Sequence, residues 1–130
     1  MAIEDMIYTK LTATTALTDI VSTRIYPLFR PQDSTTPSVV YWRVSNPVEF
    51  MFSSGDEIVM PRFQFDCYAV TFSSARSIAS KLKSAIDRWA TSSGTPIIFR
   101  TDVVNEYDSY DPELEIYLSS VDAIIHHLST

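Results

Sequence analysis

Hydrophobic and polar positions along the chain follow two spacings, one typical of helices and one typical of strands. Residues 2–21 place apolar side chains on one side of a helix, with acidic residues near its start. The stretch from Thr12 to Thr15 is expected to weaken or end this helix, because threonine side chains divert hydrogen bonds from the backbone. A second helix is predicted from Ala75 to Trp89, with Ser73 or Ser74 as its cap.

Several other segments predict strands because apolar and polar residues alternate or because β-branched and aromatic residues gather. These segments are 24–29, 38–44, 62–70, 96–104 and 114–128. Pro27 makes the first an edge strand, because proline cannot donate to a sheet ladder. Residues 49–52 and 57–60 flank Ser-Ser-Gly-Asp and predict a hairpin or long flap with its tip near Gly55. The acidic segment from Asn105 to Glu115 predicts a solvated loop.

These elements predict one α+β domain over residues 1–130, with a largely antiparallel sheet of about four to five strands and two main helices packed on one face. A chain of 130 residues has a common length for one domain, and 45% of its residues are hydrophobic. Such a chain can bury one core.

The charge and cysteine content exclude several classes of protein. The formal net charge is −6, so the chain repels phosphate backbones, and no nucleic-acid ligand is expected. The apolar runs are shorter than the roughly 18 to 20 residues of a membrane span. Cys67 is the only cysteine and has no partner within the chain, which favours synthesis in a reducing cytosol.

The sequence offers no recognisable constellation for catalysis, cofactor binding or metal binding. The two glycines, Gly55 and Gly94, lie too far apart for a phosphate-binding loop. His126 and His127 are neighbours on a predicted strand and are expected to point to opposite faces, away from a shared metal ion. We therefore predict a protein that is not an enzyme and has no cofactor.

Asp66 and Cys67 are the two residues that could still suggest an active site. Cys67 lies between Phe65 and Ala69 on the apolar face of a predicted strand, so a buried structural thiol is the favoured interpretation. Asp66 lies on the opposite face, where it could act as an acid or base only beside a second carboxylate. Pairing with a neighbouring arginine or with water is favoured instead.

The flap carries large apolar side chains where a solvated loop would carry polar ones. Such side chains pack either against the parent core or against another chain. The candidate residues for a subunit or tube interface are Phe50, Met51, Phe52, Ile58 and Met60.

The order of the elements resembles that of the tail completion or tail terminator proteins of long-tailed bacteriophages. The resemblance covers nearly the whole chain. It begins with a short N-terminal helix and continues through Arg24–Pro27, Pro37–Tyr41, Phe65–Ala69, a helix opened by Ser74-Ala75-Arg76, and a strand that ends near His126-His127.

The resemblance implies a structural virion protein, made in the host cytoplasm. It implies a homohexameric ring on the head-proximal end of the tail tube, which stops tube growth and offers a docking face to the head. Its partners would be copies of itself, the tail tube protein and a head-completion or neck protein. Genomic DNA would pass through the ring, and an acidic wall would let it slide. The candidate residues for that lumen are Asp102, Glu106, Asp108, Asp111 and Glu113.

Three alternatives remain open at this point. The nearest is another neck component of the same particle, such as a head completion or adaptor protein. A small acidic enzyme and a regulatory module that binds protein partners are the other two.

Overall fold

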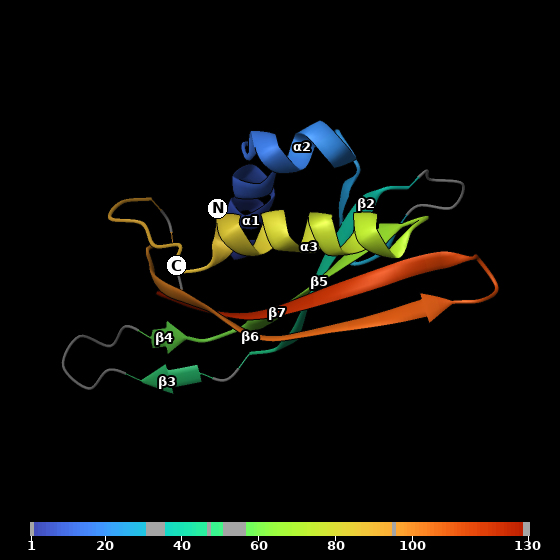
Figure 1. Cartoon of the computed structure of the whole chain (residues 1–130). Helices are drawn as coiled ribbons and strands as arrows, with labels where there is room; N and C mark the ends of the chain where they lie inside the picture. The colour runs from blue at the N-terminus through green and yellow to red at the C-terminus, as the bar shows by residue number, and fades with distance from the viewer. Residues whose placement is uncertain (1, 31–35, 47, 51–56, 95, 129–130) are drawn as a thin grey trace.

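The protein is described by a computed structural model that covers residues 2–30, 36–46, 48–50, 57–94 and 96–128. Within these residues, three helices lie on one side of a curved sheet (Figure 1). The helices are α1 (Ile3–Thr12), α2 (Thr15–Val21) and α3 (Phe72–Ile86). The strands are β1 (Ile25–Pro27), β2 (Ser38–Ser45), β3 (Val48–Phe50), β4 (Glu57–Val59), β5 (Arg62–Ala69), β6 (Ile98–Asp111) and β7 (Ile116–Leu128).

Two long antiparallel hairpins, joined by α3, make up most of the sheet. In the first, β2 pairs with β5, and a bulge between Arg43 and Ser45 shifts the register by one residue. The pair β3 and β4 continues in that shifted register, so β2–β3 and β4–β5 act as two interrupted long strands. The second hairpin consists of β6 and β7. Strand β7 has β6 along one edge and β5 followed by β4 along the other.

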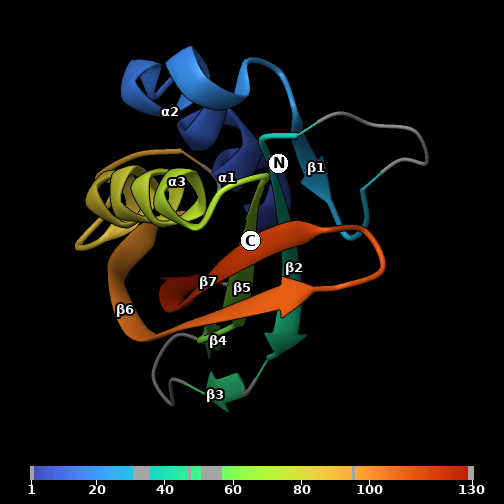
Figure 2. The same ribbon diagram turned by 45° about the vertical axis from the view of Figure 1, so that its right-hand side comes forward.

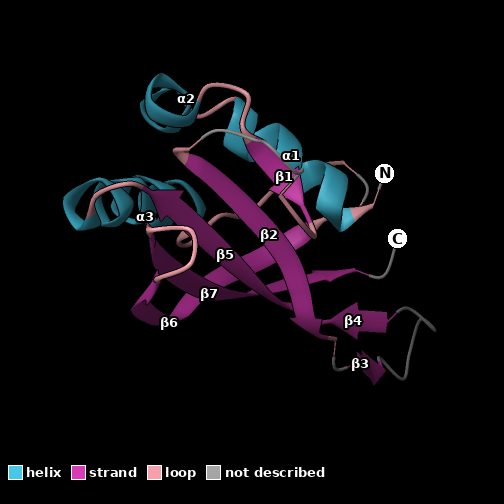
Figure 3. Ribbon diagram, turned by 90° about the vertical axis from the view of Figure 1, so that its right-hand side faces the viewer, coloured by secondary structure: helices cyan, strands magenta, loops and turns pink. Residues whose placement is uncertain are grey.

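The predicted α+β class is confirmed. Every pairing is antiparallel except that of β1 with β2, which makes the sheet mixed. Seven strands are present in the described residues, more than the predicted four to five, because β1, β3 and β4 are only three residues long. Figure 3 shows the helices stacked on the same side of the strands.

The N-terminal helical segment breaks where the threonines predict it. Helix α1 ends at Thr12 and α2 begins at Thr15. The hydroxyl of Thr12 donates to the carbonyl of Tyr8 at 2.8 Å, and that of Thr14 donates to the carbonyl of Lys10 at 2.8 Å. The Thr14 amide bonds to the carbonyl of Leu11 at 3.1 Å, so the Thr14 hydroxyl replaces it on the Lys10 carbonyl, and the chain turns into a second helix.

Helix α3 begins and ends earlier than predicted. Its cap is Thr71, whose side-chain oxygen accepts a hydrogen bond from the Ser74 amide at 3.2 Å, and neither Ser73 nor Ser74 has that role. It ends at Ile86, three residues before Trp89. Arg88 then adopts a left-handed φ of 64°, and its amide bonds to the carbonyl of Thr101 on β6. The backbone of β6 thus binds the Arg88 amide, which would otherwise continue the last turn of the helix.

The core lies between the helices and the inner face of the sheet. Phe63, Phe65, Cys67 and Ala69 all lie on this face and are buried, as predicted. Tyr41 joins them, and burial raises the pKa of its hydroxyl to about 12. That hydroxyl donates to the carbonyl of Glu4 at 3.4 Å, which ties α1 to β2.

The prediction of a solvated loop over residues 105–115 is wrong. Strand β6 continues to Asp111, and only a short turn separates it from β7. The acidic residues alternate with Tyr107, Ser109 and polar neighbours, which is the period of a strand with little burial. The negative charge of this segment predicted a loop, because the segment lacks the buried apolar face by which a strand is recognised in a sequence.

Candidate interaction surfaces

Asp66 and Cys67 lie on opposite faces of β5, and Cys67 belongs to the core. Its side chain is fully buried, and burial followed by the nearby Asp66 charge raises the pKa of the thiol far above its ordinary value. A thiolate is the reactive form of cysteine, so this environment disfavours nucleophilic chemistry. Cys67 is a structural side chain.

Asp66 is the acceptor at the centre of a hydrogen-bond network on the sheet face that points away from the helices. Its Oδ1 accepts from Gln64 Nε2 and from Ser120 Oγ, each at 2.8 Å. Its Oδ2 accepts from Trp42 Nε1 at 3.3 Å. The network links β2, β5 and β7. Among the described residues no arginine joins this network, and Arg62 pairs with Asp122 at 2.8 Å instead.

The two histidines of β7 have different environments. His126 Nε2 lies 3.5 Å from Asp102 Oδ2. His127 is buried, which lowers its pKa, and its Nδ1 lies beside the carbonyl of Leu128. Among the described residues, no group of three or more histidine, cysteine or carboxylate side chains is placed to hold a metal ion.

The flap extends from one end of the sheet, as Figures 1 and 2 show at β3 and β4. Phe50 ends β3, while Met51 and Phe52 lie outside the described residues. Val59 is buried, and its neighbours Ile58 and Met60 are half-buried. The flap therefore contributes part of its apolar surface to the parent fold and keeps part of it exposed.

The five acidic candidates for a lumen are divided among three places. Asp102 pairs with Arg100 at 2.8 Å near the start of β6. Glu106 pairs with Lys83 of α3 at 3.0 Å, and Asp108 pairs with Arg76 of α3 at 3.2 Å. The last two, Asp111 and Glu113, lie at the turn, where Asp111 Oδ1 accepts from the Glu113 amide at 3.0 Å. The structure does not bring the five carboxylates together.

An aromatic cluster at the end of the β6–β7 hairpin was not predicted. The rings of Tyr110 and Tyr117 lie 4.7 Å apart between centroids, and those of Phe72 and Tyr117 lie 6.0 Å apart. Phe72 and Tyr110 are both nearly half exposed, and Leu114 of the turn is exposed. Interpreting residues 105–115 as a loop concealed this cluster, whereas the alternation of tyrosines with acidic residues could have indicated it.

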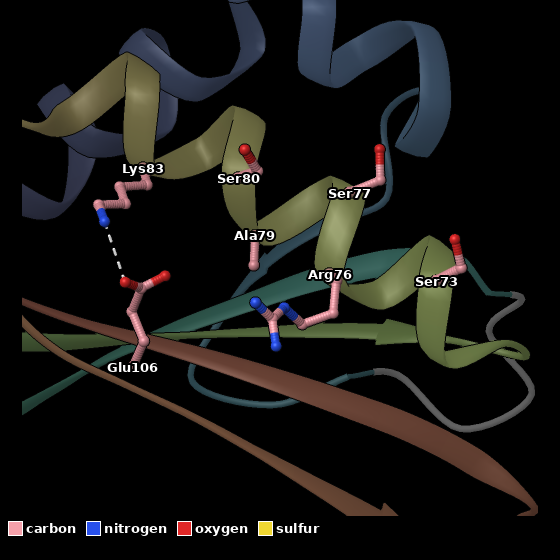
Figure 4. A pocket seen from close by; sticks show the side chains of 7 residues that line it. All are labelled: Ser73, Arg76, Ser77, Ala79, Ser80, Lys83 and Glu106. Atoms are coloured by element: carbon pink, nitrogen blue, oxygen red, sulfur yellow. Dashed lines mark hydrogen bonds and ion pairs between the residues drawn. The ribbon is translucent and has the colours of Figure 1, made fainter.

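A groove of about 440 Å³ separates α3 from the distal half of β6 (Figure 4). Small side chains line the helix wall, among them Ser73, Ser77 and Ser80. Figure 4 shows Lys83 reaching across to Glu106, with Arg76 also directed toward the sheet.

The described residues thus form a domain with several exposed surfaces that differ in composition: the apolar flap, the aromatic cluster and the polar groove beside α3. The helices in the described part of the chain are too short or too polar to cross a bilayer. The family model described as tail completion protein gp17 matches residues 5–126. The chain therefore belongs to the tail completion protein gp17 family, and it is a structural protein of a phage tail.

The fold has a counterpart among solved structures. A chain of the structure described as "Virion of native gene transfer agent (GTA) particle" superposes with a TM-score of 0.76 at 13% identity, over 95% of this chain and 92% of that one. At this identity the likeness shows a shared fold. None of the curated proteins compared with the sequence matches it.

Proposed function

We propose that this chain assembles into a closed ring, six copies around the axis, on the head-proximal end of the tail tube. The ring stops further addition of tube subunits and offers the face on which the head docks. The family match over residues 5–126 carries this proposal. It includes nearly every described element, so the whole domain is the functional unit.

The arrangement of surfaces supports a ring. A head-to-tail ring requires two different patches on each subunit, because one patch must complement the other on the next copy. The flap at β3 and β4 and the aromatic cluster at the tip of the β6–β7 hairpin lie at different ends of the sheet (Figure 1). Their separation lets each contact a different neighbour.

Tail length tests the proposed activity. Tails assembled without this protein are expected to be longer and more variable than normal and to fail to join heads, because nothing halts tube growth. Adding the purified protein during assembly should restore the normal length, measured by negative-stain electron microscopy. Tails of normal length that merely fail to join heads would identify a different neck component and refute a terminator.

The flap is proposed as a subunit or tube contact through Phe50, Met51, Phe52, Ile58 and Met60. The double variant Phe52→Asp and Met60→Asp is expected to abolish tail completion, because two carboxylates cannot be buried in an apolar interface without large desolvation costs. Circular dichroism of the purified variant checks that the domain still folds. An intact ring and tails of normal length from this folded variant would rule out the flap as the contact.

The ion pairs of β6 reduce the number of acidic residues that could form a negatively charged lumen. Asp102, Glu106 and Asp108 are balanced by basic side chains, so their charge would give little repulsion to DNA. We therefore propose that the turn between β6 and β7 faces the lumen. Its residue Glu113 is exposed and has no basic partner among the described residues. In an image of the assembled tail, Glu113 is expected to face the central channel, and a position on the outer rim would refute the lumen proposal.

A further inference from the structure

The outer edge of β6 is closed along its first half by the chain that follows α3. The amide of Arg88 donates to the carbonyl of Thr101 at 2.8 Å, and the amide of Thr91 donates to the carbonyl of Ile98 at 2.9 Å. The amide of Val103 donates to Asp87 Oδ1 at 3.4 Å. Edge strands need such protection, because their free backbone groups are a template for pairing with another chain.

The second half of the same edge has no such cover among the described residues. Backbone groups of β7 point alternately to its two neighbours: the Ile125 amide donates to Pro61, on the β5 side, and the Leu128 amide donates to Ile97, on the β6 side. Odd-numbered residues of β7 therefore bond toward β5. Their partners on β6 are Glu106, Asp108 and Tyr110, which accordingly direct their N–H and C=O groups away from β7.

These three outward positions have no backbone partner among the described residues. All three residues are exposed. The groove between α3 and β6 adjoins the first of these positions, Glu106, and on its helix wall Arg76 and Lys83 are directed toward the sheet while the serines point away from it (Figure 4). A free ladder beside a groove is the arrangement that binds a peptide by strand addition.

Charge indicates the chemistry of the added strand. The hairpin from Asn105 to Glu115 contains five acidic residues and no basic one, and only Glu106 and Asp108 have basic partners among the described residues. The sheet edges that the described residues of a second copy would offer do not suit this negative charge. Strand β1 is three residues long and ends in proline, β3 includes Glu49, and β6 carries the same acidic residues.

We propose that the distal edge of β6 binds an extended, lysine- or arginine-containing segment of a different virion protein as an additional strand. The inference deepens the proposed function, since it names the kind of partner that the domain would bind in the tail. It rests on the β6 edge itself and holds whatever the number of copies in the ring.

The test uses proline at Glu106, an outward position. Glu106→Pro removes an N–H that the isolated domain does not use, and edge strands tolerate proline where the N–H faces solvent. Glu106→Ala is the matched control, because it removes the same carboxylate and its bond to Lys83 but keeps the N–H. Tyr107 is replaced by the photo-crosslinking residue p-benzoylphenylalanine in both variants and in the parent chain, and purified tails are irradiated.

The parent chain and Glu106→Ala are expected to crosslink to a different virion protein through a peptide containing lysine or arginine, identified by mass spectrometry. Glu106→Pro should reduce that yield about tenfold, since it removes a ladder hydrogen bond and obstructs the edge. Equal yields from the Pro and Ala variants overturn the proposal, and crosslinks to a second copy of this chain alone, with none to another virion protein, overturn the partner assignment.

Hydrogen exchange on the parent protein gives a second test that does not depend on the proline variant folding. In the isolated domain, the amides of Glu106, Asp108 and Tyr110 should exchange quickly, and those of Tyr107 and Ser109 slowly. In purified tails the first three should become protected. Rapid exchange of the same three amides in tails would contradict strand addition. Neither readout depends on tail length, so this proposal can fail while the proposed function stands.

Discussion

Replacing Phe65 by alanine is expected to reduce the free energy of unfolding by about 4 kcal/mol, one of the two largest effects predicted for this domain. The side chain is fully buried. Its ring lies 6.3 Å from that of Tyr41 on β2 and 6.5 Å from that of Phe63 on β5 itself, so its removal leaves a cavity among buried aromatic side chains. A domain of this size is stable by roughly 5 to 15 kcal/mol, so the variant should be partly unfolded at modest urea concentration.

Phe99→Ala is the matched control because it makes the same chemical change on an exposed strand position. Phe99 is 48% exposed, so its truncation should cost about 0.5 kcal/mol. Urea titrations followed by circular dichroism measure both variants. The core assignment is wrong if the two lose the same stability.

Asp66→Ala is expected to cost about 2–3 kcal/mol, because it leaves the donors of Trp42, Gln64 and Ser120 without their common acceptor. Ser120 is fully buried and cannot turn to water for a replacement. Asp66→Asn should cost less, about 1 kcal/mol, since the amide oxygen can still accept from Gln64 and Ser120. Thermal or urea unfolding ranks the three proteins.

The same pair of variants separates a structural carboxylate from a catalytic one. If Asp66 is part of the scaffold, tail completion by each variant should follow its folded fraction at the assay temperature. The asparagine variant, which should fold, should complete tails almost as well as the parent chain. A folded Asp66→Asn protein that cannot complete tails would assign a chemical role to the carboxylate.

Much of the fold follows from side-chain spacing. The buried face of β5 and the amphipathic helix α3 repeat apolar residues at the period of their element, so their type and inward side could be predicted. The break between α1 and α2 followed from threonine chemistry. These features depend on residues close together in the sequence.

What could not be predicted depends on pairing between distant segments. The first half of β6 was predicted as a strand, but its distal half is recognisable only through its register with β7, since it carries acidic and aromatic side chains with no buried face. The end of α3 at Ile86 results from competition by the β6 edge for the Arg88 amide. The candidate surfaces could not be predicted for the same reason. The groove combines residues of α3 and β6, and the aromatic cluster combines residues of α3, β6 and β7.

We propose that this domain works by shape, as a ring at the head-proximal end of the tail tube. Cryo-electron microscopy of intact particles tests it most directly, by locating the chain and counting its copies. We expect six copies in one layer, directly between the last tube layer and the neck, with neighbouring subunits in head-to-tail contact. Density for the chain elsewhere in the particle, or as isolated copies without a closed ring, would contradict it.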